Sequence, residues 1–435
     1  MTLPAYSEYK DSGVKWLDTV PAHWKFTKTK HICSFSTGWT PPTGDSSAYE
    51  GDNLWANISD LGERFLVDTA KRISDEAVKK AGIPLSPKGS LLFSFKLSIG
   101  QVSFAGSDMY TNEAIATFRN SKELSVSYAY YAFPLFLVKN ATDNIYGAKL
   151  LNQELIGSAI LVLPPREEQN AITSFLDHET GKIDTLIAEQ EKLLALLTEK
   201  RQATISHAVT KGLNPDVPMK DSGVEWLGKV PAHWKTTRLK YATSLIVDCP
   251  HETPAYSDDG AYKVIRTADI SLGLLDSSKT YHVDEVEYIN RIRRQALCKN
   301  DIIYGREGER WGFAALVPDD NIFCLGQRMM QFRAASTTCS SYLMWQLNSV
   351  STYRQGQIDT VGATSPHVNV GTIRNYLLAE PPFKEQLSIS NFLDRETAKL
   401  DALTAEANRT IELLKERRSA LISAAVTGQI DVRQA

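Results

Sequence analysis

The chain has 435 residues, of which 43% are hydrophobic and 23% are charged, as in an ordinary soluble globular protein. Its formal net charge of −3 argues against a nucleic-acid-binding protein, although a near-neutral total can hide a basic face. The five cysteines form no C-x-x-C pair, so neither a zinc ribbon nor a redox dithiol is supported, and their odd number argues against a secreted disulfide framework.

The N-terminal segment carries no apolar core of a signal peptide, so we expect a cytoplasmic protein. It leads into KDSGVKWLDTVPAHW at 10–24, which returns as KDSGVEWLGKVPAHW at 220–234. Twelve of the fifteen positions are identical, at an offset of 210 residues. The chain is therefore built from two copies of one unit.

A globular segment follows each copy, at 25–163 and at 235–380. Both are rich in Gly, Ser, Tyr and short β-like runs, and we predict one mixed α/β (α+β) fold for both. The longest apolar run, YAYYAFPLFLV at 128–138, is too short to span a bilayer and contains Pro134. We expect this run to form a buried helix, and we expect no membrane partner.

The two globular segments share a skeleton, although their sequences differ far more than the flanking segments do. The stretches that lie opposite one another are 86–106 and 297–317, 54–62 and 263–273, and 146–165 and 361–382. The pattern therefore predicts two domains with one fold and different surfaces.

A long helix is predicted after each domain. Residues 164–210 and 381–427 are identical at about half of their positions, with no gap. Prolines mark each entry and Gly212 and Gly428 mark the exits. The apolar positions expected to pack against a partner are Ile183, Leu186, Leu193, Leu197, Leu400, Leu403, Leu414 and Leu421.

The partner expected for each helix is the other helix, because one apolar stripe on a long helix must be covered. Antiparallel pairing would make a coiled coil, place the domains at opposite ends and create a pseudo-twofold axis. The alternative is two unrelated surface helices.

Motifs for catalysis are missing. The chain has no GxGxxG, no phosphate-binding GxxxxGK[ST] loop and no GxSxG elbow. HETGK at 178–182 and HETPA at 251–255 lack the second histidine of a zinc-protease motif. We therefore expect no catalytic residue and no metal ligand in this chain.

The doubled motifs resemble a known family. The chain is similar to the specificity subunit of Type I restriction–modification systems in three features. These are the connector motif SG-x-x-WL-x-x-VP-x-HW, the helix starts PP-x-x-EQ and FLD-x-ET-x-K-x-D, and two dissimilar domains that alternate with two similar helices. The resemblance covers essentially the whole chain. It implies a non-catalytic subunit of a restriction and DNA-modification complex that acts in phage defence.

The resemblance implies a division of the chain. A first target-recognition domain would occupy 1–163 with its connector at 9–24, a first helical spacer 164–212, a second target-recognition domain 213–380 with its connector at 220–234, a second spacer 381–428, and a tail 429–435. Each domain would read one half of an asymmetric double-stranded DNA target, and the helices would set the gap.

The resemblance also implies partners and cofactors. Two adenine-methyltransferase subunits would dock on the helices, and endonuclease/translocase subunits would join them. S-adenosylmethionine, ATP and Mg²⁺ would belong to these partners, and this chain would bind none of them. The four connector tryptophans, Trp16, Trp24, Trp226 and Trp234, are expected to pack, because both halves keep them while their targets differ.

Base reading needs Arg, Lys, Asn, Gln, Ser or Thr on projecting loops. YGREGERWG at 304–312 is the first candidate, with Arg306 and Arg310, although Glu307 and Glu309 could pair with them. The further candidates from the two domains are Lys96, Ser98, Gln101, Asn112, Lys149, Asn152, Gln327, Arg328, Thr364, Ser365, His367 and Asn369.

Two more groups are candidates for the DNA backbone. Arg291, Arg293 and Arg294 form a basic cluster suited to phosphate, unless they are a solvated helix face. Trp39 in GWTPPTG at 38–44 could lie against the DNA backbone or pack instead.

Two other functions compete with DNA specificity. A scaffold protein would use the coiled coil to recruit partners and would bind no DNA in a sequence-dependent manner. A self-sufficient nuclease or methyltransferase would need a cofactor motif that the sequence lacks.

Overall fold

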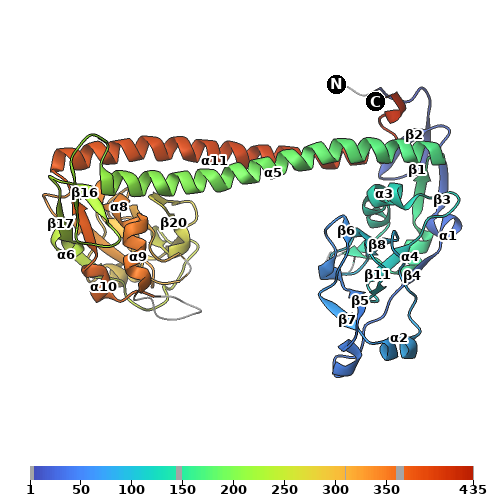
Figure 1. The fold of residues 1–435 in the computed structure, drawn as a ribbon, viewed down its shortest axis with the longest axis horizontal. Coiled ribbons are helices and arrows are strands. Elements are labelled where there is room, and N and C mark those ends of the chain that lie inside the picture. Colours follow the sequence, from blue (N-terminus) through green and yellow to red (C-terminus); the bar gives the residue numbers. More distant parts are fainter. Residues whose placement is uncertain (1–3, 144–148, 309, 359–366, 435) are drawn as a thin grey trace. The chain divides into compact units, whose positions relative to one another are not determined.

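The computed structural model describes residues 4–143, 149–308, 310–358 and 367–434 (Figure 1). The chain forms two compact units, Met1–Glu189 with Arg409–Ala435, and Gln190–Asn408. Each unit therefore contains one globular domain together with parts of both long helices, α5 (Arg166–Lys211) and α11 (Phe383–Val426). The units divide the chain inside the helices, whereas the sequence pattern divides it at the helix ends.

The first domain is built around a five-stranded sheet in the order β4-β11-β8-β9-β6. Its strands are β4 (Phe35–Thr37), β11 (Ile115–Phe118), β8 (Leu91–Ser94), β9 (Val102–Ala105) and β6 (Phe65–Leu66). A smaller sheet, β10-β5-β7, lies in the same domain and consists of β10 (Tyr110–Thr111), β5 (Asn53–Ala56) and β7 (Lys71–Ile73).

The second domain repeats this strand order. Its larger sheet runs β18-β26-β23-β24, with β18 (Thr243–Asp248), β26 (Met329–Ala334), β23 (Ile302–Gly305) and β24 (Ala314–Leu316). Its smaller sheet, β22-β19-β25, consists of β22 (Tyr281–Val283), β19 (Tyr262–Ile265) and β25 (Phe323–Leu325). The predicted fold class, two similar α+β domains alternating with two long helices, is confirmed.

Short elements complete each domain. In the first unit these are β1 (Tyr9–Val14), β2 (Leu17–Pro21), β3 (Lys25–Lys28), α1 (Thr29–Ile32), η1 (Ser46–Tyr49), η2 (Ile58–Asp60), α2 (Asp75–Ala81), β12 (Thr142–Asp143), β13 (Lys149–Leu150), α4 (Gln153–Ser158), β14 (Ile160–Leu163) and η4 (Val432–Gln434). In the second unit they are β15 (Met219–Asp221), β16 (Lys229–Pro231), β17 (Lys235–Arg238), α6 (Leu239–Ala242), η3 (Thr267–Asp269), β20 (Ile270–Ser271), β21 (Leu274–Leu275), α7 (Glu285–Ile292), α9 (Val350–Ile358), α10 (Val370–Arg374) and β27 (Leu377–Glu380).

The apolar run at 128–138 lies in helix α3 (Val126–Lys139), as predicted, which follows β11; helix α8 (Ser340–Leu347) follows the equivalent strand β26 in the second domain. Seven of the eleven side chains in the run, among them Tyr128, Phe133 and Phe136, are buried in the domain core. Among the described residues, no helix has the length and apolar character needed to span a membrane. The apolar run is therefore a core element.

The long helices begin and end where the sequence signals predict. Each starts directly after a Pro-Pro pair, and each is followed by a glycine with positive φ, 76° at Gly212 and 74° at Gly428. Glycine adopts this left-handed conformation without the steric penalty of other residues, so it ends a helix cleanly. At Gly428, an added Cβ would also lie only 2.3 Å from Pro21.

The helices lie side by side and run antiparallel within each unit. In the first unit Arg418 pairs with Asp184 at 2.8 Å, and Leu421 packs in the same core as Phe175. In the second unit Arg201 pairs with Asp401, and Ile205 packs in the same core as Ile389. The two ion pairs occupy equivalent positions of the repeat.

The prediction of which apolar residues pack is only partly correct. Ile183, Leu197 and Leu400 are buried and Leu414 and Leu421 are half-buried. Leu186, Leu193 and Leu403 are 45%, 39% and 52% exposed, so they do not pack in the seam between the two helices. A two-helix seam covers only a narrow stripe of each helix, and these three residues lie beside it. Ala407 and Ile411, which are not among the predicted packing positions, are buried instead.

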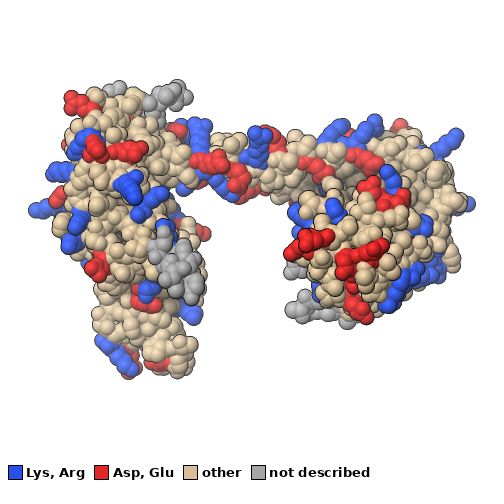
Figure 2. Space-filling model, turned by 180° about the vertical axis from the view of Figure 1, so that it is seen from behind, with Lys and Arg blue, Asp and Glu red and all other residues tan. Residues whose placement is uncertain are grey.

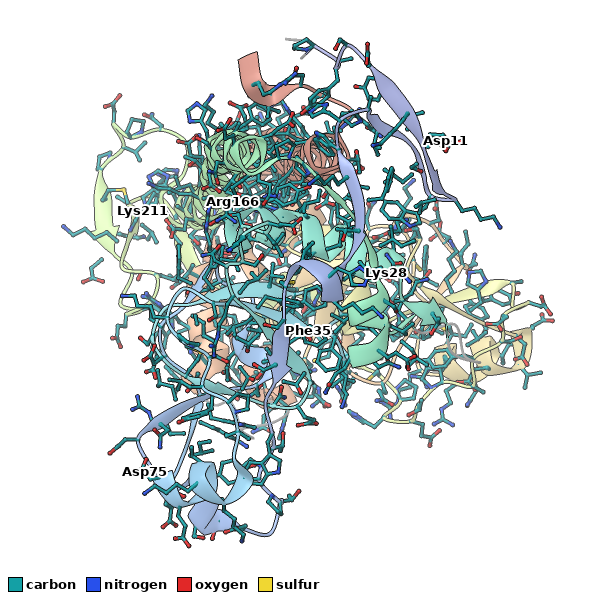
Figure 3. The ribbon with its side chains drawn as sticks, turned by 90° about the vertical axis from the view of Figure 1, so that its right-hand side faces the viewer. Asp11, Lys28, Phe35, Asp75, Arg166 and Lys211 are labelled. Atoms are coloured by element: carbon teal, nitrogen blue, oxygen red, sulfur yellow. The ribbon has the colours of Figure 1, made fainter. Side chains whose placement is uncertain are left out.

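The repeated connectors dock on the helix ends. His23 Nε2 lies 2.9 Å from Glu168 at the start of α5, and His233 Nε2 lies 2.9 Å from Glu385 at the start of α11. Trp24 and Trp234 are fully buried, so the prediction that they pack is confirmed. Figure 3 marks the first connector at Asp11 and the start of α5 at Arg166. The connector sequence is therefore needed twice because it seats each domain on the helices.

Candidate nucleic-acid interface

In the first domain, strand pairing brings three loops to one edge of the large sheet. β4 pairs with β11 at Thr37 and Ala116, and β8 pairs with β11 at Ser94 and Ile115. Because β11 is antiparallel to both neighbours, the ends of β4 and β8 meet the start of β11. The loops that leave this edge are 38–44, 94–101 and 111–113.

Backbone and side-chain contacts hold these loops together. Trp39 donates its backbone N–H to the carbonyl of Thr111 at 2.9 Å, and Phe95 donates to that of Ala114 at 3.0 Å. Gln153, at the start of α4, donates to the Thr37 hydroxyl at 2.9 Å. We call the predicted residues gathered here the first strand-end surface: Trp39, Lys96, Ser98, Gln101, Asn112 and Asn152.

Most side chains of the first strand-end surface are accessible. Lys96, Ser98, Gln101 and Asn152 are exposed, and Trp39 and Asn112 are half-buried. Asn112 and Asn152 also have local roles, because their side-chain oxygens accept backbone N–H groups at 3.1 Å and 2.8 Å. Lys149 is exposed on β13, shortly before Asn152. These groups supply the donors and acceptors that base edges require.

A groove of about 930 Å³ adjoins the first strand-end surface. It is lined by Thr40 and Pro41 of the 38–44 loop and by Tyr49, Lys71 and Arg72. The Lys71 ammonium lies 5.3 Å from the centroid of the Tyr49 ring. Sequence reasoning missed Lys71 and Arg72, because two cations in a short polar stretch resemble any solvated strand.

The second domain has the same arrangement at the equivalent edge. β18 pairs with β26 at Asp248 and Met330, and β23 pairs with β26 at Gly305 and Met329. The loops that leave this edge are 249–253, 305–312 and 326–328. We call the candidates gathered here the second strand-end surface: Arg306, Arg310, Gln327, Arg328, His367 and Asn369.

These residues also contact one another through backbone and side chains. The backbone N–H of Arg306 donates to the carbonyl of Arg328 at 3.0 Å, and that of Val368 donates to the carbonyl of Arg306 at 3.3 Å. The Thr253 hydroxyl donates to Gln327 Oε1 at 2.7 Å. Segments that are far apart in sequence therefore converge on one surface in this domain as well.

The arginines of the second strand-end surface differ in accessibility. Arg306 is 8% exposed and its guanidinium pairs with Glu307 and lies 3.6 Å from Asp248. The structure therefore shows the alternative in which Arg306 pairs with Glu307. Glu309 lies outside the described residues. Arg310 is exposed and donates to the carbonyl of Ala268 at 3.2 Å.

Arg328 is exposed and makes no ion pair or side-chain hydrogen bond with any described residue. His367 is half-buried and Asn369 is exposed. The candidates Thr364 and Ser365 lie outside the described residues. Arg328 is therefore the cation of this surface that is most available to a ligand.

The basic cluster predicted at 291–294 does not act as one group. Arg291 is 4% exposed and donates to the carbonyls of Leu325, Glu252 and Pro250 at 2.8–3.2 Å. The prediction of a phosphate contact is therefore wrong for Arg291, because its donors are consumed in holding the 249–253 loop. Arg293 and Arg294 are exposed, and Arg294 also donates to the carbonyl of Asp248 at 2.8 Å.

Asp248, Cys249 and His251 lie close enough together to raise the question of a metal ion. Cys249 is fully buried, and this burial raises the pKa of its thiol to about 11, whereas a metal ligand must be a thiolate. The guanidinium of Arg306 already lies beside Asp248 and within 3.5 Å of His251. The chemistry of this cluster fits an ion-pair network that supports the second strand-end surface better than it fits a metal site.

Side chains of both charge signs lie on the face of the molecule that Figure 2 draws. On the face drawn in Figure 2, Lys and Arg side chains are interspersed with Asp and Glu in each unit. The net charge of −3 agrees with this distribution. Lys96, Lys71 and Arg328 are exposed cations within or beside the two strand-end surfaces.

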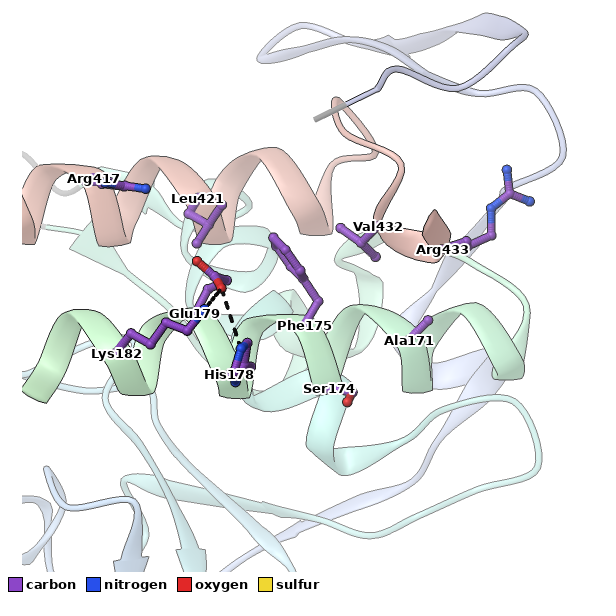
Figure 4. Close-up of a pocket in the computed structure, with 10 residues that line it drawn as sticks. All are labelled: Ala171, Ser174, Phe175, His178, Glu179, Lys182, Arg417, Leu421, Val432 and Arg433. Atoms are coloured by element: carbon purple, nitrogen blue, oxygen red, sulfur yellow. Dashed lines mark hydrogen bonds and ion pairs between the residues drawn. The ribbon is translucent and has the colours of Figure 1, made fainter. Parts of the chain in front are cut away.

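A second concave feature, of about 800 Å³, lies in the first unit beside the helix pair (Figure 4). Phe175, Leu421 and Val432 contribute apolar surface, and Lys182 and Arg417 contribute charge. Lys182 donates to Glu179 at 2.7 Å and holds the pKa of that carboxyl below its ordinary value. The second unit repeats this ion pair between Lys399 and Glu396 at 2.6 Å.

Comparison with known proteins gives a consistent result. The family model described as the Type I restriction modification DNA specificity domain matches residues 21–195 and 248–413. The chain is 22% identical to the Type I restriction enzyme MjaIX specificity subunit of Methanocaldococcus jannaschii, over 98% of both chains. It is 22% identical to the EcoBI specificity subunit of Escherichia coli, over 69% of this chain and 65% of that one.

Two solved structures share the fold. A chain of a type I R-M system superposes with a TM-score of 0.71 at 14% identity, covering 94% of this chain and 99% of the other. The HsdS subunit from Thermoanaerobacter tengcongensis superposes with a TM-score of 0.54 at 14% identity, covering 97% of this chain and 100% of the other.

Proposed function

The chain belongs to the family of Type I restriction modification DNA specificity domains, and from this premise we propose that each strand-end surface reads one half of an asymmetric, two-part DNA target. Its role is that of the non-catalytic specificity subunit. In the proposal, the first strand-end surface reads one half-site, the second reads the other, and the helix pair sets the unread gap between them.

One observation carries the proposal. Each domain brings its loops to the equivalent edge of its larger sheet, yet the loops of the two domains differ in chemistry. The first edge offers Lys96, Ser98 and Gln101, whereas the second offers Arg310, Gln327 and Arg328. A shared scaffold with divergent loops is what two different half-sites require, because base identity is read by side chains on projecting elements.

The helices would fix the spacing of the two half-sites. The buried seam residues and the ion pairs Asp184–Arg418 and Asp401–Arg201 hold the helices in one register within each unit. A shift by one helical turn would break both ion pairs and move Ile183 and Leu400 out of the seam. The gap is therefore proposed to be constant for this chain.

Two adenine-methyltransferase subunits are proposed to dock on the helices, and endonuclease/translocase subunits to join them. A partner present in two copies needs the same surface twice, and the helices provide it. Leu186 and Leu403 are equivalent, exposed and apolar, and the Glu179–Lys182 and Glu396–Lys399 pairs are equivalent and charged. S-adenosylmethionine, ATP and Mg²⁺ are proposed to bind to those partners.

The alternative function is a scaffold that recruits partners through the helices without reading DNA. The decisive experiment expresses this chain with its cognate adenine methyltransferase in a methylation-free host and maps N6-methyladenine across the genome. We expect a two-part motif with a fixed gap that vanishes when this chain is omitted. Methylation that is unchanged without the chain would support the scaffold.

Sequence-specific binding should also depend on salt. Each phosphate contact made by Lys or Arg releases a condensed counterion, so the affinity falls steeply as the salt concentration rises. The purified complex should lose affinity for its target duplex between low and physiological salt. A salt-independent association would contradict the proposed contact with the DNA backbone.

A further inference from the structure

The tip of the 94–101 loop carries a leucine in an unusual state. Leu97 is 91% exposed, the highest value among the large hydrophobic side chains of the described residues. Its φ is +56°, in the left-handed region that side chains other than Asn and Asp rarely adopt. The other two described non-glycine residues with positive φ are Asn300 and Asn321. An apolar side chain is therefore exposed to solvent on a strained backbone, a combination that is typical of functional sites.

The loop around Leu97 is held firmly by its own backbone. Ser94 is buried, donates its N–H to the carbonyl of Gln101 at 2.9 Å, and accepts the N–H of Gly100 at 2.9 Å. The Ser94 hydroxyl donates to the carbonyl of Lys96 at 3.1 Å, and the N–H of Ile99 donates to the carbonyl of Leu97 at 2.9 Å. These contacts hold the turn in shape, so Leu97 projects from an ordered base.

The apolar residues two positions before and after Leu97 both pack against the domain core. Phe95 is buried in the domain core, and Ile99 is half-buried and packs against the same core. The loop thus alternates between side chains that point inward and Leu97, which points outward. The apolar core lies close to Leu97, but the side chain of Leu97 points into solvent and does not pack against that core.

Leu97 also lies among the polar groups that suit a nucleic acid. Lys96 and Ser98 are its sequence neighbours and are exposed, and Gln101 follows on the same loop. Cationic and hydroxyl groups bind phosphates, whereas an apolar side chain between them is suited to the interior of a groove. Apolar side chains meet DNA in two ways, on the C5-methyl group of thymine or as a wedge between base pairs.

We propose that Leu97 enters the DNA of the first half-site and makes an apolar contact with a base, and that it helps to determine the specificity of this domain. The inference rests on the proposed function. It concerns the first half-site alone, because the described part of the equivalent loop in the second domain presents Arg310. The ordered turn lowers the entropic cost of placing Leu97 in the groove.

The test uses the complex of the full chain with its methyltransferase partner and the duplex that the methylation map defines. Leu97→Ala should weaken binding to this duplex about tenfold, the effect of one lost base contact, and leave binding to unrelated DNA unchanged. Leu85→Ala is the matched control, since Leu85 is an exposed leucine before β8, at the other end of that strand. It should bind like the wild type.

A glycine variant separates binding from folding. Leu97→Gly should weaken specific binding as much as Leu97→Ala does, while the melting temperature stays equal or rises, because glycine accepts positive φ. Leu97→Met should retain most of the affinity. A residue with a merely structural role would show the opposite pattern, a lower melting temperature without a selective loss of specific binding.

Modified DNA distinguishes the two kinds of contact. Replacing a thymine of the first half-site with uracil removes one methyl group, and if Leu97 contacts that methyl, wild-type binding should fall to the Leu97→Ala level. If Leu97 is a wedge, 2-aminopurine in the half-site should brighten on binding of the wild type but not of Leu97→Ala. Either result supports the proposal.

Wild-type affinity for Leu97→Ala, with weakened binding for Lys96→Ala, would overturn the role of Leu97 and leave the proposed function intact. The absence of any sequence-specific binding by the wild-type complex, or of any motif in the methylation map, would instead overturn the proposed function and this inference with it.

Discussion

His23 pairs with Glu168 in the first unit and His233 pairs with Glu385 in the second, both at 2.9 Å, whereas the loops at the two strand ends share almost no chemistry. The connector repeats other contacts as well, because Lys10 donates to the carbonyl of Trp24 and Lys220 donates to the carbonyl of Trp234, both at 2.5 Å. The two halves are thus alike in the connectors that contact the helices and different in the loops at the strand ends. The difference separates assembly from recognition.

The shared connectors are not fully equivalent. Trp24 Nε1 donates to Glu168 at 3.0 Å, whereas Trp234 Nε1 has no hydrogen-bond partner among the described residues. Arg433 lies 3.6 Å from Glu168, and Asp431 donates its backbone N–H to the carbonyl of Pro4 at 2.7 Å. The tail after α11 therefore reinforces the first connector, and four predictions test how far the two halves are alike.

The largest expected effect comes from removing a connector tryptophan. Trp24→Ala and Trp234→Ala should each lower the free energy of unfolding by about 3–5 kcal/mol, because both side chains are fully buried. Chemical denaturation of the chain in complex with its partner would measure the loss. Trp16→Ala is the control, since Trp16 is only half-buried and should cost less. Equal and small losses for all three variants would contradict a seating role for the connector.

A substitution in one strand-end surface should affect the recognition of one half-site only. Arg328→Ala should weaken binding to the target by about 1–3 kcal/mol and relax the base preference of the second half-site only. Competition with duplexes mutated in one half-site at a time would measure this. Lys299→Ala removes an exposed cation before the other end of β23 and should leave both half-sites unchanged. A loss of preference in the first half-site would show that the two surfaces are coupled.

The asymmetry of the tryptophans predicts a smaller difference. Trp24→Phe loses both buried volume and a hydrogen bond to Glu168, whereas Trp234→Phe loses volume alone. Trp24→Phe should therefore destabilise the protein by about 1 kcal/mol more than Trp234→Phe. Thermal unfolding of the two variants would measure the difference, and identical costs would mean that the bond to Glu168 contributes nothing net.

The smallest effect concerns pH. The hydrogen bond from Arg433 holds the pKa of Asp431 below its ordinary 3.8. A carboxyl with a lowered pKa in the folded state stabilises that state above its unfolded pKa, and the contribution disappears as the pH falls through the folded pKa. Asp431→Asn should therefore cost about 1 kcal/mol at neutral pH, and this cost should begin to shrink as the pH falls below about 3.8 and vanish once the pH lies below the folded-state pKa of Asp431.

Thermal unfolding of Asp431→Asn as a function of pH would follow this loss. Asp216→Asn, at an exposed carboxylate after α5, is the control and should change the stability by less than about 0.5 kcal/mol at any pH. A cost for Asp431→Asn that persists in acid would show that the tail is held by contacts other than the ion pair.

The repeat, the ends of both long helices and the family could be predicted from the amino-acid sequence. These features are local: proline and glycine act on their own backbone, and helical periodicity needs only neighbouring residues. The loops that carry candidate residues were also predictable, because residue type and turn chemistry are read directly from the chain. The side of the domain on which Lys96, Asn112 and Trp39 meet followed only once the strands were paired.

Which of these side chains reach solvent depends on how distant segments pack. Arg291 and Arg293 are two residues apart and chemically identical, yet the first is buried by carbonyls of two other segments and the second is exposed. Leu186 and Ile183 lie on one helix, but only Ile183 faces the seam. Burial depends on segments that are distant in the chain, and for this reason neither the buried arginine nor the exposed Leu97 could be read from local pattern.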